Sequence, residues 1–225
     1  LTSTLTTRGD IVYKGASALT RLPKGSTGQV LKQGANDPEW GTVSSDFVKL
    51  YDYDGTGQSA VTTFNVDGYF NDALYRHYKV IVSDVYAPAN SNSSEFLIRF
   101  NVGGSPVTSS NYRWSLDEAH RQGHHNRGSQ NDTSISQSQG TWSARGDNVS
   151  LQALDMMFFS PTSTGTGAKQ MTWNGIWHQN NGGGYHGATM GSGQLNTTSA
   201  LTGFNFSMAN SHTFTYKISI YGYKK

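Results

Sequence analysis

The chain has 225 residues, of which 35% are hydrophobic, 12% aromatic and 14% charged, and it contains 26 glycines. Low charge combined with many aromatic residues excludes a disordered chain and indicates an all-β protein with glycine turns. The 17 basic and 15 acidic residues form no basic stripe, so we expect no nucleic-acid partner, and the lack of cysteine excludes disulfides, thiolate catalysis and cysteine zinc sites.

No apolar run approaches ~18 residues and no signal-peptide pattern occurs, so we expect no membrane insertion. We also expect no cofactor, because no cofactor-binding motif is present. The chain begins with Leu1 rather than methionine. We therefore expect a processed protein or a part of a longer one.

The first segment, residues 1–42, has short β-type runs at 11–13, 29–31 and 39–41, separated by glycine- and proline-rich turn signals. It contains few large apolar residues. A segment of this size cannot bury enough surface to offset its chain entropy, so it should be ordered only against another surface. The expected surface is further copies of the same segment.

The run from Thr6 to Trp40 reads TTRGDIVYKGASALTRLPKGSTGQVLKQGANDPEW. It resembles a module of tailed-bacteriophage fibre and spike proteins, in which the glycines, Pro23, the Gly28–Leu31 core and the closing Pro38-Glu39-Trp40 follow in this order. The resemblance implies the shaft or neck of a homotrimeric fibre. Short strands without a core of their own agree with pairing between chains.

The second segment, residues 43–225, alternates short strands with turns and has no helical periodicity. It predicts an antiparallel β-sandwich of jelly-roll type that serves as a distal head. A polar excursion is expected at 117–140 and a glycine-rich loop at 179–193. The predicted strands are 47–51, 60–66, 78–86, 95–102, 112–114, 149–159, 169–178, 201–208 and 212–223.

Three stretches of this segment are similar to the distal domain of phage fibre proteins. They are Tyr112-Arg113-Trp114, the strand from Leu201 to Phe206, and the final strand from Lys217 to Gly222. The similarity implies a distal head and leaves the ligand open.

An aromatic and amide-rich cluster is the candidate ligand-binding site. It consists of Trp142, Asn180, Asn181, Tyr185 and His186. Sugars are held by aromatic rings that stack on their apolar faces and by amides or imidazoles that bond their hydroxyls. We therefore expect a glycan or receptor contact here.

A histidine-rich stretch raises the question of a metal site. His120, His124 and His125 lie close in sequence, but their spacing matches no known site, and neighbouring arginines add positive charge. These three are weak candidates, and we expect a solvated polar loop rather than a metal. The two Arg-Gly-Asp triplets, at 8–10 and 145–147, are expected to be turns.

Enzyme signatures are lacking. No G-x-S-x-G, H-E-x-x-H or P-loop pattern occurs, and no carboxylates are paired in sequence, so we expect no catalytic residues. Asp155 lies inside an apolar strand, where a bonded partner is the favoured interpretation. Trp173 and Trp177 alternate in phase and are expected in the core.

These observations together predict a non-enzymatic, homotrimeric fibre or spike protein on the virion surface. Its N-terminal segment would contact another virion protein, and its head would contact a host-surface glycan or receptor, with three copies adding up weak contacts. One alternative is a capsid head fibre or decoration protein that stabilises the virion or adheres loosely. Another is a glycan-depolymerising tailspike, which needs two carboxylates beside a groove.

Overall fold

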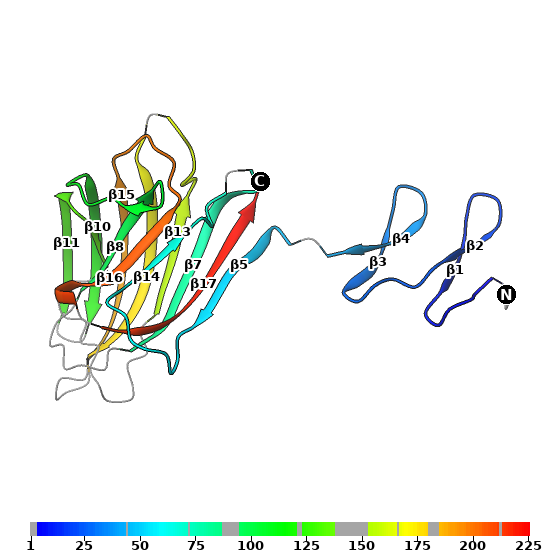
Figure 1. Ribbon diagram of the computed structural model, residues 1–225, viewed down its shortest axis with the longest axis horizontal. Helices are drawn as coiled ribbons and strands as arrows, with labels where there is room; N and C mark the ends of the chain where they lie inside the picture. Colours follow the sequence, from blue (N-terminus) through cyan, green and yellow to red (C-terminus); the bar gives the residue numbers. More distant parts are fainter. Residues whose placement is uncertain are drawn as a thin grey trace. The chain divides into compact units, whose positions relative to one another are not determined.

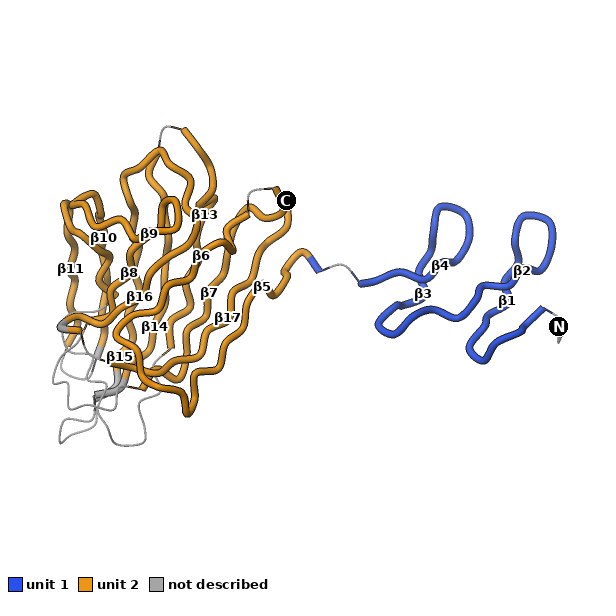
Figure 2. Tube along the Cα trace, viewed as in Figure 1, with its two compact units in different colours: residues 1–45 blue, residues 46–225 orange. Residues whose placement is uncertain are grey.

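The structure is a computed structural model that describes residues 4–43, 45–71, 73–86, 95–120, 123–137, 153–165, 167–179, 185–211 and 213–225. The chain divides into two compact units, Leu1–Ser45 and Asp46–Lys225 (Figure 2). The sequence placed the division between residues 42 and 43. Within the described ranges, no helix is long and apolar enough to cross a membrane.

The first unit consists of two antiparallel hairpins (Figure 1). One joins β1 (Ile11–Lys14) to β2 (Leu19–Leu22), and the other joins β3 (Gln29–Gln33) to β4 (Pro38–Thr42). Strand β2 was not expected from the sequence, because a single four-residue run between Ala18 and Pro23 carries almost no alternation.

Asp10 fixes the entry to the first hairpin. Its carboxylate accepts hydrogen bonds from the backbone N–H groups of Thr7 at 2.8 Å and Lys24 at 3.0 Å, and from Arg21 Nε at 2.7 Å. The Arg21 guanidinium holds the pKa of Asp10 well below its usual value. Since the Asp10 N–H also bonds the Thr7 carbonyl at 3.1 Å, the prediction of a turn at residues 8–10 is confirmed.

Trp40 links the two hairpins of this unit. Its indole N–H donates to the Pro23 carbonyl at 2.6 Å, and its ring lies so close to Gly25 that an added Cβ there would be 2.7 Å away. Nevertheless, none of the hydrophobic side chains described in this unit is buried. The unit is therefore held by turns and hydrogen bonds rather than by a core.

The second unit contains two antiparallel sheets in its described part (Figure 1). The large sheet has the order β11 (Gly123–Asp132), β10 (Tyr112–His120), β15 (Tyr185–Leu195), β14 (Lys169–Gln179), β13 (Ala153–Phe159), β7 (Tyr75–Tyr86), β17 (Thr215–Lys224), β5 (Phe47–Asp54). The small sheet has the order β12 (Ile135–Ser136), β8 (Phe96–Val102), β16 (Gly203–Met208), β6 (Thr63–Asp67), and β9 (Ser105–Pro106) pairs with β8. A short 3₁₀ helix, η1 (Ala209–Ser211), follows β16.

The two sheets pack face to face around an aromatic core. Phe158 of the large sheet lies 5.3 Å from Phe204 and 5.7 Å from Phe100 of the small sheet, measured between ring centroids. All three rings are fully buried. The alternation predicted for 95–102 places Phe96, Ile98 and Phe100 in this core, as expected. The all-β prediction is confirmed, and the second unit is a two-layer β-sandwich.

The glycine-rich loop predicted at 179–193 is wrong from residue 185 onward, because this stretch is the long strand β15. A Cβ at Gly187 would lie 2.2 Å from Trp177, and one at Gly191 would lie 2.2 Å from Trp173. The glycines thus make room on the core face for two indoles from the neighbouring strand. Both tryptophans are buried, which confirms their predicted core position.

The polar excursion predicted at 117–140 is also wrong in its described part. Strands β10 and β11 form a hairpin that pairs Glu118 with His125 and His120 with Gly123. Strand β11 lies at the edge of the large sheet, so the backbone groups along one of its sides have no neighbour among the described strands, and such a strand needs few apolar residues. The polar composition therefore concealed a strand.

Candidate ligand-binding face

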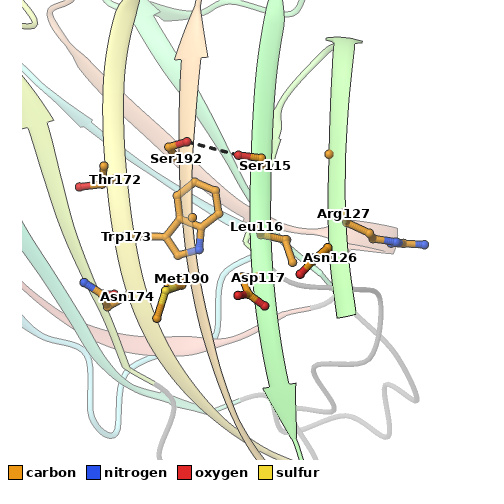
Figure 3. Close-up of a pocket in the computed structure, with 12 residues that line it drawn as sticks. Ser115, Leu116, Asp117, Asn126, Arg127, Thr172, Trp173, Asn174, Met190 and Ser192 are labelled. Atoms are coloured by element: carbon orange, nitrogen blue, oxygen red, sulfur yellow. Dashed lines mark hydrogen bonds between the residues drawn. The ribbon is translucent and has the colours of Figure 1, made fainter. Parts of the chain in front are cut away.

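Four neighbouring strands, β14, β15, β10 and β11, present alternate side chains on the outer face of the large sheet. Their register aligns Thr172 with Ser192, Ser192 with Ser115, and Ser115 with Gly128, so that small residues form one row across the strands (Figure 3). The Ser115 and Ser192 hydroxyls lie 3.4 Å apart. This row is the floor of a shallow depression.

Longer side chains stand on both sides of this floor, because residues two positions apart on a strand share a face. On one side the register aligns Gln170, Gln194 and Arg113. On the other side it aligns Asn174, Met190, Asp117 and Asn126. We call the floor row with its two flanking rows the trough.

The trough comprises two adjoining hollows of about 700 and about 470 Å³. Both hollows are lined by Ser115, Thr172 and Ser192, the three hydroxyl residues of the floor. At the β13 side, Met157 pairs with Thr172 and ends the row of small residues. At the β11 side, the row ends at Gly128 on the sheet edge.

Two of the charged side chains that line the trough lie close to a partner within the chain. Asp117 Oδ1 lies 2.7 Å from His124 Nε2, and Arg127 Nη1 lies 3.5 Å from Glu95 Oε1. The described residues that line the two hollows include a single carboxylate, Asp117.

Asp155 lies on the same outer face beside the trough. Its carboxylate is 2.7 Å from Lys79 Nζ, which confirms the predicted bonded partner. The hydrogen bond to Asp155 raises the pKa of Lys79 above its usual value. This pair is half-exposed and carries no free charge toward the trough.

Most of the predicted ligand cluster lies outside the described residues. Trp142, Asn180 and Asn181 are in ranges that the structure does not describe. Tyr185 and His186 begin β15, where the backbone pairs them with Gln179 and His178, and their side chains are not described. The structure therefore leaves this cluster as a prediction.

The histidine-rich stretch belongs to the β10–β11 hairpin rather than to the expected loop. His124 and His125 are exposed on β11, and the backbone of His120 ends β10. In the described ranges, no group of three or more His, Cys, Asp or Glu side chains is placed to hold a metal ion.

The outer face of the small sheet has a hollow of its own, of about 480 Å³. Two of its polar groups bond one another, since Asn205 Nδ2 donates to Thr63 Oγ1 at 2.8 Å, and Arg99 Nε donates to the Thr133 carbonyl at 3.0 Å. These side chains stabilise the sheet. The trough differs, since in the described part of the chain its floor hydroxyls show one such contact, between Ser115 and Ser192.

The sequence held a partial signal for the trough. Gln170, Thr172 and Asn174 alternate with core residues in a strand that was predicted, so their outward direction could be derived. Ser192 lay in a predicted loop, and Ser115 next to a predicted excursion. Comparison of the chain with protein-family models, with curated proteins and with solved structures finds no match.

Proposed function

We propose that the chain is a homotrimeric fibre or spike protein on the surface of a phage virion. In this proposal the first unit forms the trimeric shaft or neck and contacts another virion protein. The second unit is a jelly-roll-like head that attaches to a host-surface glycan or receptor. The observation that carries the proposal is that the first unit buries none of its described hydrophobic side chains.

Several hydrophobic side chains of the first unit are exposed. Leu19, Val30, Leu31 and Val43 are exposed by 60, 43, 49 and 73%. Two-stranded hairpins of four or five residues are marginal in water, and their outer backbone groups remain unpaired. Packing against two further copies would cover both the side chains and the strand edges.

The head, in contrast to the first unit, is stabilised within one chain, so its outer face is available to bind a ligand. It has a large aromatic core of its own and a polar, open face with a trough. Three heads on one shaft would convert weak contacts at each trough into firm attachment.

Mass in solution tests the proposal. Sedimentation of the full chain at micromolar concentration should give three times the 24.5 kDa of one chain. Leu19→Ser and Leu31→Ser should shift the mass toward one chain, because they remove apolar contacts between copies. The matched control is Leu74→Ser, at a residue of the head that is 55% exposed. A single-chain mass for the unmodified protein would refute the trimer.

The trough does not favour the glycan-cleaving alternative. Glycosidases use two carboxyl groups roughly 5–9.5 Å apart, whereas Asp117 stands without a second carboxylate among the described lining residues. Incubation with a bound polysaccharide should leave its chain length unchanged. Imaging virions with a label at Lys225 would separate a tail fibre from a capsid head fibre.

A further inference from the structure

The trough has the form of a ligand subsite that crosses the strands. Its floor runs over four strands, so the distance between the outer two is about 14 Å, given a spacing of about 4.8 Å between neighbours. Thr172, Ser192 and Ser115 place a hydroxyl on each of three successive strands. A ligand lying on this floor would meet hydrogen-bonding groups at regular intervals.

The flanking rows supply amides on both sides of the floor. Gln170 and Gln194 stand on one side, and Asn174 and Asn126 stand on the other. Each amide offers both a donor and an acceptor, as does each hydroxyl of the floor. This combination matches a ligand whose own groups are hydroxyls, which also donate and accept.

Exposed apolar surface lies at the rim. The Met190 side chain is 57% exposed and the Phe159 side chain is 41% exposed, and each lines one of the two hollows. Ring C–H faces of a sugar pack on such surfaces while the hydroxyls turn to the amides.

The charges argue against an ionic ligand. The described residues that line the trough include two arginines, Arg113 and Arg127, and one carboxylate, Asp117. Arg127 lies 3.5 Å from Glu95 and Asp117 lies 2.7 Å from His124, so these residues form no cluster of like charges. A polyanion would need clustered arginines or lysines. An extended peptide would need free backbone groups, whereas those of β14, β15 and β10 are used in the sheet and, among the described strands of the trough, only the edge strand β11 has a free side.

We propose that the trough binds an uncharged oligosaccharide of a few units, laid across strands β14, β15, β10 and β11. This inference rests on the proposed adhesive function and names its site and ligand class. The floor hydroxyls and flanking amides bond the sugar hydroxyls, and Met190 and Phe159 contact its apolar faces.

The test uses the full chain on an array of defined bacterial surface oligosaccharides, both neutral and acidic. Ser192→Tyr fills the floor without touching the core, and it should reduce binding to neutral oligosaccharides at least tenfold. Ser207→Tyr, a half-buried residue lining the hollow of the small sheet, is the matched control and should bind as the unmodified protein does. Gln194→Ala should weaken binding about three- to tenfold, because it removes one hydrogen-bonding group.

The outcomes separate the trough from the adhesive function. Equal binding by the unmodified chain and Ser192→Tyr would overturn the trough and leave adhesion intact. Binding to acidic oligosaccharides alone would overturn the ligand class. If the unmodified chain binds neither the array nor intact host cells, the adhesive function itself is overturned. Sedimentation and thermal unfolding of each variant verify that it is folded.

Discussion

The two units of this chain use β-strands in opposite ways. The first unit has four strands of four or five residues in two hairpins, and its described leucines and valines are exposed or half-exposed. The second unit pairs up to eight strands in one sheet and covers that sheet with another around buried phenylalanines. Local hydrogen bonds dominate the first unit, and long-range packing dominates the second.

This difference teaches where each unit obtains its stability. Burial of apolar surface is the largest favourable contribution to folding, and the second unit obtains it within one chain. The first unit is held by its turns, by the hydrogen bonds of the Asp10 carboxylate and by the hydrogen bond from Trp40 to Pro23. These contacts fix the backbone but bury little apolar surface. We propose that the remaining stability of the first unit comes from contacts with further copies of the chain.

The largest effect is expected when the units are separated. A peptide of residues 1–45, diluted until it sediments as a single chain, should show no cooperative thermal transition, because a chain of this length without a core cannot offset its entropy. Residues 46–225 should unfold cooperatively with nearly the full-chain midpoint. Circular dichroism during heating measures both. A sharp thermal transition for the dilute peptide would contradict the inference that the first unit is unstable as a single chain.

A second effect concerns the aromatic core. Phe158→Ala should destabilise the second unit by about 3–5 kcal/mol, because a ring in contact with Phe100 and Phe204 is removed and a cavity remains. Urea unfolding gives this value. Leu19→Ala in the first unit is the comparison, and the unfolding of the second unit should not change with it. Similar losses from both variants would show that the units share one core.

A smaller effect is expected from a buried hydroxyl that joins the two sheets. Tyr112 accepts a hydrogen bond from the Phe100 N–H at 2.8 Å and donates one to the Val107 carbonyl at 3.0 Å, and burial raises its pKa to about 12. Tyr112→Phe should cost about 1–3 kcal/mol, since the Phe100 N–H is left unpaired. Tyr75→Phe, at a partly buried tyrosine, should cost less in the same urea titration.

The smallest effect is local and depends on pH. The pKa of Asp10 is lowered in the folded unit, chiefly by Arg21, so its contribution to stability is complete above the ordinary value of 3.8 and is lost as the pH falls below it. The amide NMR signals of Thr7 and Lys24 should shift in that range. Asp10→Asn should abolish the pH dependence of these signals. Unchanged signals down to the lowest pH measured would disprove the role of Asp10.

Parts of the fold could be predicted because their signals are local. Phe96, Ile98 and Phe100 alternate strictly, and Trp173 and Trp177 alternate in phase, so their inward direction follows from the period of a strand. The turn at Asp10 follows from the preference of Gly-Asp for turns.

Other parts depend on partners that are distant in sequence. Gly187 and Gly191 resemble loop glycines until the indoles that occupy their space are known, and the β10–β11 hairpin resembles a loop until its neighbour β15 is placed. The trough has the same origin. Thr172, Ser115 and Ser192 are ordinary surface residues in sequence, and only the register of three strands aligns them.

The ends of the second unit meet at one place. The backbone N–H of Lys224 donates to the carbonyl of Asp46 at 2.8 Å, and β5 and β17 are neighbours at one edge of the large sheet, whereas the trough begins at the other edge with β11. The second unit can therefore be moved as one piece. If it is inserted into a loop of an unrelated carrier protein through these adjacent ends, the four strands of the trough should stay clear of the junction.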